Sequence, residues 1–315
     1  MKVFYIVNLN SGKSVIGAKL GSVVDILTKS GIETTIYSTQ SQGDATIKAK
    51  EACESGEYDY VLCSGGDGTF SEVINGVMNA AKELPVGYIP TGSTNDFARG
   101  LGIPLKVEKA AEAFVDGKKV RCDVGVCNDK TFLYVAAFGV FTDISYETPQ
   151  NIKNILGHVA YIFNGISKLG KYTEMSCNMK IEYISEKDEK VSVEGDFVYG
   201  MVTNSSSVAG FLSLNNFLYD DGVFEVTLVK KPKNLIDFHK IVTSLNNIKE
   251  GADTDVFVSF RAKKAKFTIV DNKDIPWTLD GEFGGKERVH IIENKRRAVT
   301  LVVDKDNVPE DKFIE

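Results

Sequence analysis

Short apolar runs alternate with amphipathic segments over the first 122 residues of this 315-residue chain. The segments between the runs carry apolar residues three or four positions apart, which is the spacing of one face of a helix. Strands that alternate with helices are typical of a mostly parallel sheet covered by helices, so we predict an α/β domain over residues 1–122. The runs that we interpret as its strands are 2–7, 32–37, 58–63 and 86–89.

The pattern changes after residue 122, where strand-like runs dominate and two stretches, 155–169 and 233–248, have helical spacing. A series of strand-like runs with few helices between them predicts an antiparallel β-rich domain over residues 123–295. The runs on which this prediction depends are 132–137, 179–183, 197–203, 223–229, 256–260, 267–270 and 289–292.

Composition limits the classes of partner. The formal net charge is −6, which argues against nucleic acid. The basic runs at 263–266 and 295–297 are interpreted as solvated charges beside strands, although contact with an anionic membrane stays open.

Compartment is indicated by the cysteines and by the hydropathy. The five cysteines are odd in number and lack the spacing of a zinc site, which favours a reducing compartment. We find neither a secretory signal nor a run of about 20 apolar residues that would span a membrane. These features predict a cytoplasmic protein without a transmembrane segment.

A glycine-rich loop, Gly65-Gly66-Asp67-Gly68-Thr69, follows the third predicted strand. Glycines let the backbone approach a phosphate closely, and the N–H groups of the following helix can bind it. An anionic side chain repels phosphate, so Asp67 is expected to hold Mg²⁺ or to fix the loop. The alternative is an ordinary tight turn before a helix.

Two further polar loops are predicted at the same edge of the sheet. The segment 90–99, Pro-Thr-Gly-Ser-Thr-Asn-Asp-Phe-Ala-Arg, follows the fourth strand, and its Asp96 is a candidate for binding a metal or capping a helix. The segment 8–14 follows the first strand and contains Gly12-Lys13-Ser14. It is not a Walker A motif, because Val7 stands where that motif requires glycine.

A pair of carboxylates, Asp280 and Glu282, flanks Gly281 in the second half of the chain. Either carboxylate could accept the proton of an attacking hydroxyl as a general base. Asp-Gly is also a favoured turn dipeptide, so a plain β-turn is the alternative.

Taken together, these motifs resemble the diacylglycerol kinase catalytic-domain family, and especially its bacterial lipid kinases. The resemblance extends over essentially the whole chain and depends on 65–69, 90–99 and 279–282. It implies an α/β nucleotide-binding domain related to those of NAD kinase and phosphofructokinase, followed by an antiparallel β-sandwich-like domain. It also suggests that residues 296–315 return to the first domain.

The resemblance implies Mg²⁺-dependent transfer of the γ-phosphate of ATP to a lipid hydroxyl, with diacylglycerol as the expected substrate. Asp280 or Glu282 would be the base, of which we favour Asp280, and Asp67 and Asp96 would complete the catalytic set. A structural Mg²⁺ is implied at Asp221 with the carbonyls of Leu218 and Val223. The predicted nucleotide contacts are Asn8, Leu9, Asn10, Ser11, Gly12, Thr39, Gly65, Gly66, Asp67, Gly68, Thr69, Glu72, Thr91, Gly92, Ser93 and Asn95.

Two alternatives have other functions. A kinase of a soluble metabolite, such as an NAD kinase, would share Gly-Gly-Asp-Gly-Thr, but would not be expected to carry the segments at 94–99 and 279–282. A non-catalytic regulator that binds nucleotide or lipid could use the same scaffold. A lipid kinase would contact the membrane surface transiently from the cytoplasm, and a homodimer is left open.

Overall fold

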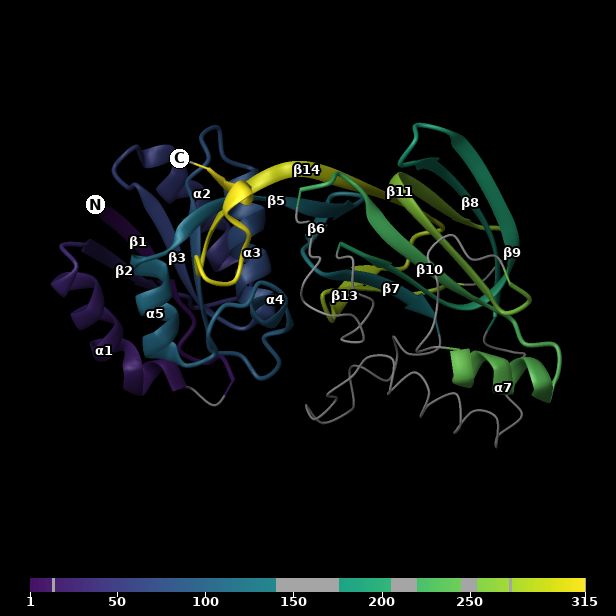
Figure 1. Cartoon of the computed structure of the whole chain (residues 1–315), viewed down its shortest axis with the longest axis horizontal. Coiled ribbons are helices and arrows are strands. Elements are labelled where there is room, and N and C mark those ends of the chain that lie inside the picture. Colours follow the sequence, from purple (N-terminus) through teal and green to yellow (C-terminus); the bar gives the residue numbers. More distant parts are fainter. Residues whose placement is uncertain (13–14, 140–175, 205–219, 245–253, 272–273, 315) are drawn as a thin grey trace. The chain divides into compact units, whose positions relative to one another are not determined.

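The structure is a computed structural model of the whole chain (Figure 1). It divides into two compact units, Met1–Val124 with Arg297–Glu315 and Gly125–Arg296, whose bounds lie within two residues of those expected. The predicted helix at 155–169 lies outside the described residues. The structure describes residues 1–12, 15–139, 176–204, 220–244, 254–271 and 274–314.

The first unit alternates strands with helices as the sequence predicts. Its elements are β1 (Lys2–Val7), α1 (Val15–Lys29), β2 (Glu33–Ser38), α2 (Asp44–Ser55), β3 (Tyr60–Gly65), α3 (Asp67–Met78), β4 (Val86–Pro90), α4 (Asp96–Gly100), α5 (Val107–Val115), the first part of β5 (Lys118–Cys127), the second part of β14 (Val289–Val303), a 3₁₀ turn (Glu310–Lys312) and β15 (Phe313–Ile314).

The parallel strands of this unit lie in the order β14-β4-β3-β1-β2, and β15 pairs antiparallel with β5, which also pairs with β14. The chain steps from β1 outward to β2 and then crosses to β3 on the other side of β1. Because such crossovers are right-handed, α1 lies on one face of the sheet, and α2 and α3 lie on the other. Figure 1 is consistent with this arrangement, with α1 beside α5 and α2 beside α3. The C-terminal strand lies beside β4 in this sheet, where Leu301 of β14 pairs with Val86.

The second unit is built of antiparallel strands, and the expected fold class is confirmed. Its elements are the end of β5, β6 (Lys130–Phe132), β7 (Val135–Gly139), β8 (Cys177–Ser185), β9 (Lys190–Thr203), β10 (Phe224–Lys230), α7 (Leu235–Ser244), β11 (Phe257–Ile269), β12 (Trp277–Leu279), β13 (Glu282–Gly285) and the start of β14.

Two long strands, β9 and β11, shape this second unit because each changes partner along its length and also pairs with a third strand, β7 for β9 and β14 for β11. The first half of β9 pairs with β8 and its second half with β10, whereas β11 pairs first with β10 and then with β8. A register shift at Ala262/Lys264 lies where β11 changes partner. The runs predicted at 256–260 and 267–270 are therefore one strand, and the run at 289–292 is the start of β14, which continues to Val303.

A core rich in aromatic side chains supports the second unit. Trp277 is fully buried and packs against Phe138 and Phe267, with ring centroids 4.8 and 5.0 Å apart. Burial of large aromatic surfaces is a major stabilising contribution in a domain of this size. The core anchors β12 and therefore the hairpin that follows it. Among the described residues, no helix has the length and apolar character needed to cross a membrane.

Candidate active site

Three of the predicted polar loops meet at the carboxyl edge of the parallel sheet. They follow β1, β3 and β4, which are neighbours in the order β4-β3-β1. The connection after β1 runs to β2 and the connection after β3 runs the opposite way to β4, which makes the edge between β1 and β3 a topological switch point. Ligands of α/β sheets bind outside the carboxyl ends of strands at such a point.

Hydrogen bonds join the loop after β1 to β3 and α3. The backbone N–H of Asn8 donates to the carbonyl of Ser64 at 2.8 Å. The Asn8 side-chain Nδ2 donates to Oγ1 of Thr69 at 2.9 Å. These contacts bring the predicted residues Asn8 and Thr69 together, although they are 61 positions apart in the sequence.

The same loop is also held against the loop after β4. The hydroxyls of Ser11 and Thr91 are 2.7 Å apart, and both residues are buried. Gly12 has φ +55°, and a Cβ there would lie 2.4 Å from the carbonyl oxygen of Thr91. Only glycine fits this position without displacing the neighbouring backbone.

Hydrogen bonds from neighbouring strands fix the backbone before the glycine-rich loop, and the sequence motifs did not indicate the groups that make them. The carbonyl of Gly65 accepts the N–H of Thr91 at 2.8 Å and the hydroxyl of Tyr88 at 3.2 Å. Tyr5 Oη and Ser64 Oγ are 2.6 Å apart. Burial raises the pKa values of both tyrosine hydroxyls, so they stay protonated and can donate. Tyrosines spaced along apolar strands were the only sequence signal for this support.

Asp67 lies at the start of α3, and its carboxylate reaches the start of α4. It accepts the N–H of Asp96 at 3.1 Å, the N–H of Phe97 at 3.3 Å and the hydroxyl of Thr94 at 3.2 Å. A carboxylate at this position satisfies the first N–H groups of the short helix and complements its dipole. These hydrogen bonds fix the start of α4, and they are compatible with either of the roles expected for Asp67.

Asp96 lies beside Asp67, and the two negative charges affect each other. Partial removal from water raises the pKa of the Asp96 carboxyl above its usual value, and the charge of Asp67 adds to the shift while Arg99 opposes it. A divalent cation would offset this repulsion. Mg²⁺ is commonly held by one or two carboxylates together with substrate phosphates, so Asp67 and Asp96 fit that ion. Within the described residues, no group of three or more His, Cys, Asp or Glu side chains could hold a metal unaided.

Asn95 shapes the loop after β4 through its amide. Its Oδ1 accepts the N–H of Gly92 at 2.8 Å, and its Nδ2 donates to the carbonyl of the same glycine at 2.9 Å. The residue is buried and has φ +52°, a conformation that asparagine tolerates better than most residues do. We therefore interpret Asn95 as a residue that sets the conformation of Gly92 and the exposed Ser93.

The loop after β2 is connected to α3 through Glu72. The N–H of Gly43 donates to Oε1 of Glu72 at 2.9 Å, and the hydroxyl of Thr46 donates to the carbonyl of Glu72 at 3.0 Å. Thr39 follows β2 directly, and its N–H donates to the carbonyl of Val7 at 3.0 Å. All four loops at this edge are thus joined by hydrogen bonds.

In the second unit, Asp280 and Gly281 form the two-residue turn between β12 and β13. Both have positive φ, +49° and +88°, as a type I′ hairpin turn requires. The Asp280 carboxylate accepts three backbone N–H groups, those of Leu133 at 2.7 Å and of Tyr134 and Val135 at 2.9 Å each. These bonds tie the turn to the segment between β6 and β7.

Glu282 is the first residue of β13 and is exposed. In the part of the chain that the structure describes, its carboxylate makes no hydrogen bond or ion pair. The two carboxylates of this hairpin therefore differ in environment. Asp280 is bound to backbone N–H groups, whereas Glu282 is open to a ligand.

The expected structural metal site is only partly described, because Leu218 lies outside the described residues. Asp221 Oδ1 accepts the N–H of Val223 at 3.1 Å, and its other oxygen contacts the guanidinium of Arg261. The carbonyl of Val223 accepts Nδ2 of Asn294 at 2.9 Å. A cation at Asp221 would be repelled by Arg261, so the described residues do not fit the implied Mg²⁺ in this arrangement. Arg261 was not singled out by the sequence motifs.

Comparison with known proteins is consistent with the motifs. The model of the diacylglycerol kinase catalytic domain matches residues 2–127. A diacylglycerol kinase from Staphylococcus carnosus is 33% identical over 303 residues, which cover 96% of this chain and 94% of that protein. A diacylglycerol kinase from Staphylococcus saprophyticus is 35% identical over 283 residues, covering 89% of this chain and 88% of the other.

Solved structures share the fold. The crystal structure of a diacylglycerol kinase from Bacillus anthracis has a TM-score of 0.71 and 22% identity, and covers 98% of each chain. A second structure from that organism has a TM-score of 0.76 and 24% identity, over 98% of this chain and 96% of the other. With relatives at least 33% identical over nearly its whole length, this chain belongs to the diacylglycerol kinase family of lipid kinases.

Proposed function

We propose that this kinase transfers the γ-phosphate of ATP to the free hydroxyl of diacylglycerol and forms phosphatidic acid in a Mg²⁺-dependent reaction. The observation that carries the proposal is the meeting of the loops after β1, β3 and β4 at one edge of the sheet. The names of the similar proteins support the lipid substrate.

The nucleotide would bind at this edge. The N–H groups at the start of α3 are available for its phosphates, and the glycines at 65, 66 and 68 allow close approach. Asn8 and Ser11 hold the first loop in place, so the site is largely formed before ATP binds. When bound, Mg²⁺ would neutralise charge on the phosphates, and Asp67 and Asp96 are its candidate ligands.

We assign the general base to Glu282 instead of Asp280. The lone pairs of Asp280 already accept three N–H groups, which suits a residue that positions the hairpin. Glu282 is two positions away, exposed and free to meet a substrate hydroxyl. In the reaction, Glu282 would take the hydroxyl proton while the lipid oxygen bonds to the γ-phosphorus, and ADP would leave with the electrons of the broken P–O bond.

The protein would carry out this reaction from the cytoplasm and meet its lipid at the membrane surface. Catalysis of phosphoryl transfer depends mainly on positioning and on stabilisation of charge. Both requirements are supported by loops that hydrogen bonds already fix. A homodimer is compatible with this proposal but is not needed for it.

The test is transfer of labelled phosphate from ATP, with and without Mg²⁺, to diacylglycerol, ceramide, sphingosine or a polyprenol in mixed micelles. NAD and a lipid-free sample are included. Selective labelling of diacylglycerol supports the proposal, and labelling of another lipid changes the substrate. Labelling of NAD alone would indicate a soluble-metabolite kinase, and ATP binding without transfer to any acceptor would indicate a regulator.

A further inference from the structure

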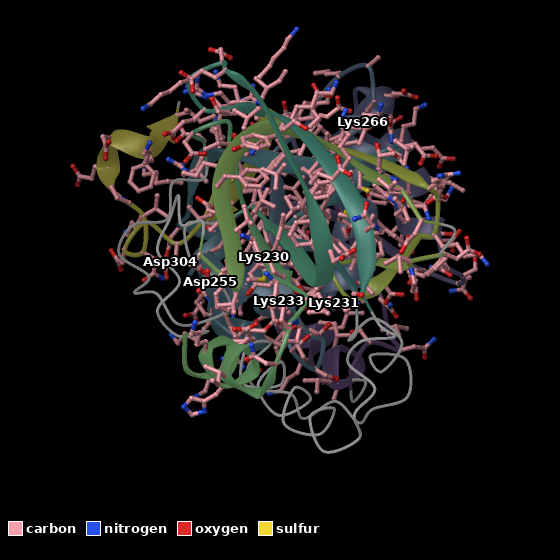
Figure 2. The ribbon with its side chains drawn as sticks, turned by 90° about the vertical axis from the view of Figure 1, so that its right-hand side faces the viewer. Lys230, Lys231, Lys233, Asp255, Lys266 and Asp304 are labelled. Carbon is pink, nitrogen blue, oxygen red and sulfur yellow. The ribbon has the colours of Figure 1, made fainter. Side chains whose placement is uncertain are left out.

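The connection from β10 to α7 carries an unusual concentration of positive charge for this acidic chain. Residues 230–240 contain four lysines and one aspartate, whereas the whole protein has a formal charge of −6. Figure 2 labels Lys230, Lys231 and Lys233 of this connection near one another. We define Lys231, Lys233, Ile236 and Lys240 as the α7 patch.

An exposed apolar side chain lies among these cations. Ile236 is 68% exposed, the highest value among the exposed large hydrophobic side chains of the described residues. Residues four apart share a face of a helix, so Ile236 and the exposed Lys240 lie on the same side of α7. Ile241 is fully buried and anchors the opposite side. The outward face of α7 is therefore apolar at one point and basic beside it.

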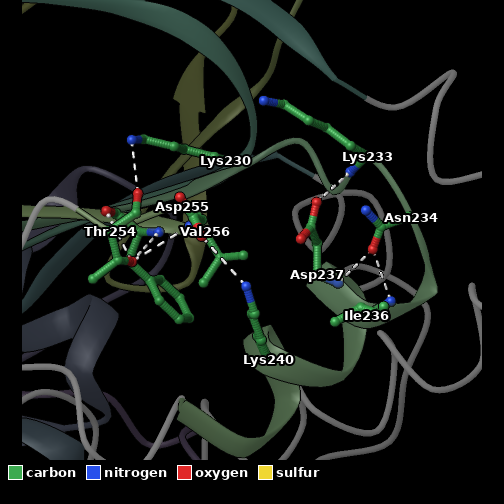
Figure 3. Close-up of polar contacts among 10 residues, drawn as sticks. Lys230, Lys233, Asn234, Ile236, Asp237, Lys240, Thr254, Asp255 and Val256 are labelled. Atoms are coloured by element: carbon green, nitrogen blue, oxygen red, sulfur yellow. Dashed lines mark hydrogen bonds and ion pairs between the residues drawn. The ribbon is translucent and has the colours of Figure 1, made fainter.

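The start of α7 is held firmly, which fixes the direction of Ile236. Asn234 Oδ1 accepts the N–H groups of Ile236 and Asp237 at 2.9 Å each, and Asp237 Oδ2 accepts the N–H of Lys233 at 3.0 Å (Figure 3). The asparagine is thus an N-cap of the usual kind. The one aspartate of the segment is committed to the same helix start.

The lysines of the segment differ in how far their charges are used. Lys230 donates to the carbonyl of Thr254 at 2.8 Å, and Lys240 pairs with Asp255 at 3.3 Å (Figure 3). Within the described part of the chain, the ammonium groups of Lys231 and Lys233 make no ion pair. By contrast, the lysines at 263, 264 and 266 face Asp188, Glu293 and Glu182, respectively.

We propose that the α7 patch docks the protein on the surface of an anionic phospholipid bilayer. Lysines near such a surface are attracted to acidic headgroups, and an exposed aliphatic side chain can enter the boundary with the acyl chains. A nucleic acid would match the charge but would leave Ile236 without an apolar partner, and a lipid kinase has to reach a bilayer in any case, which favours the bilayer over an acidic protein. Docking of this kind would bring the proposed lipid kinase to its substrate, so the physiological purpose of the α7 patch rests on the proposed function.

The test measures co-sedimentation of the full chain with vesicles of phosphatidylcholine containing phosphatidylglycerol, without ATP or diacylglycerol. Wild type is expected to bind these vesicles, to bind pure phosphatidylcholine weakly, and to be released by salt. In Lys231→Gln/Lys233→Gln, binding should fall about fivefold for each lysine removed. In Ile236→Ser it should fall about tenfold, through loss of buried apolar surface.

Matched variants control for charge and hydrophobicity in general. Lys264→Gln/Lys266→Gln removes the same net charge elsewhere in the second unit, and Ile47→Ser removes an isoleucine that is 56% exposed in α2. Both controls should bind as wild type does. The proposal is overturned if wild type does not bind anionic vesicles or if the patch variants bind them as wild type does. It is also overturned if the control variants lose as much vesicle binding as the patch variants. Loss of oligonucleotide binding alone in the patch variants would assign the surface to nucleic acid.

Failure of the kinase proposal is distinguished by a second readout. Phosphate transfer to a short-chain diacylglycerol dispersed as monomers should be equal in wild type and patch variants, whereas transfer to diacylglycerol in anionic vesicles should fall in the variants. No transfer to either form, with the vesicle-binding pattern intact, would refute the proposed function and leave the docking surface standing. If the patch variants and wild type transfer phosphate equally well to diacylglycerol in anionic vesicles, docking through the α7 patch is refuted as the route to the substrate.

Discussion

Replacing Asp280 with asparagine should separate positioning from chemistry in the β12–β13 hairpin. Asparagine keeps the size of the side chain and tolerates φ +49°, so the turn itself is preserved. Its single oxygen can still accept the N–H groups of Tyr134 and Val135, which both donate to Oδ1. Its NH₂ group, however, would face the N–H of Leu133, now 2.7 Å from Oδ2.

The expected loss follows from these bonds. Hydrogen bonds to a charged group contribute about 1.5–3 kcal/mol each, and a donor left unpaired costs about 1–3 kcal/mol. Since Asp280 is only partly buried, we expect a total loss of about 2–4 kcal/mol in the free energy of unfolding of the second unit. For a unit of this size, that loss lowers Tm by roughly 4–16 °C.

The assay is calorimetric unfolding combined with phosphate transfer, and Glu282→Gln is the matched variant. The exposed Glu282 should leave Tm unchanged when replaced, while transfer falls about 10²–10⁴-fold through loss of the base. Asp280→Asn should retain transfer at temperatures well below its Tm. An Asp280→Asn protein with the wild-type Tm would refute the structural role, and full transfer by Glu282→Gln would refute its assignment as the base.

Three further predictions concern other parts of the protein. Gly12→Ala should weaken ATP binding at least tenfold by calorimetry, because its Cβ would meet the carbonyl of Thr91, whereas Gly17→Ala, with open space around it, should bind normally. His290 is buried against Trp277, and burial lowers the pKa of its imidazole. As the pH falls, the unfolded chain therefore binds a proton at this residue before the folded protein does, which favours unfolding. Tm should fall as the pH drops below about 6.5, and it should fall less steeply in His290→Phe. Arg261→Gln leaves Asp221 and Glu225 without their cation and should lower the free energy of unfolding by about 1–3 kcal/mol. Mg²⁺ should raise the Tm of this variant more than that of wild type, and an equal rise in both proteins would contradict the reasoning.

The order and type of the elements in the first unit could be predicted because local patterning determines them. Apolar runs of strand length and helical spacing report which face of each element is buried, and the burial of β1, β3 and β4 agrees with that pattern. The glycine-rich and polar loops could be located for a similar reason, because each follows an apolar run and parallel strands end at one edge.

The contacts within the candidate site depend on residues far apart in sequence, so no local pattern reports them. Asp67 caps α4 from another helix, and Tyr88 supports Gly65 from the neighbouring strand. Arg261 lies 40 residues from the carboxylate that it contacts. Such pairings are set by how strands align in the sheet.

The sequence by itself thus determined the fold class, the family and the residue types that carry the chemistry, because these depend on periodicity and on short contiguous motifs. Only the tertiary structure decided how the two hairpin carboxylates differ. Asp280 and Glu282 are both candidate bases in the sequence, with Asp280 favoured by the family resemblance, but the hairpin turns Asp280 toward three N–H groups and leaves Glu282 exposed. The environment of a carboxylate depends on which backbone groups folding brings beside it, and that environment determines its role.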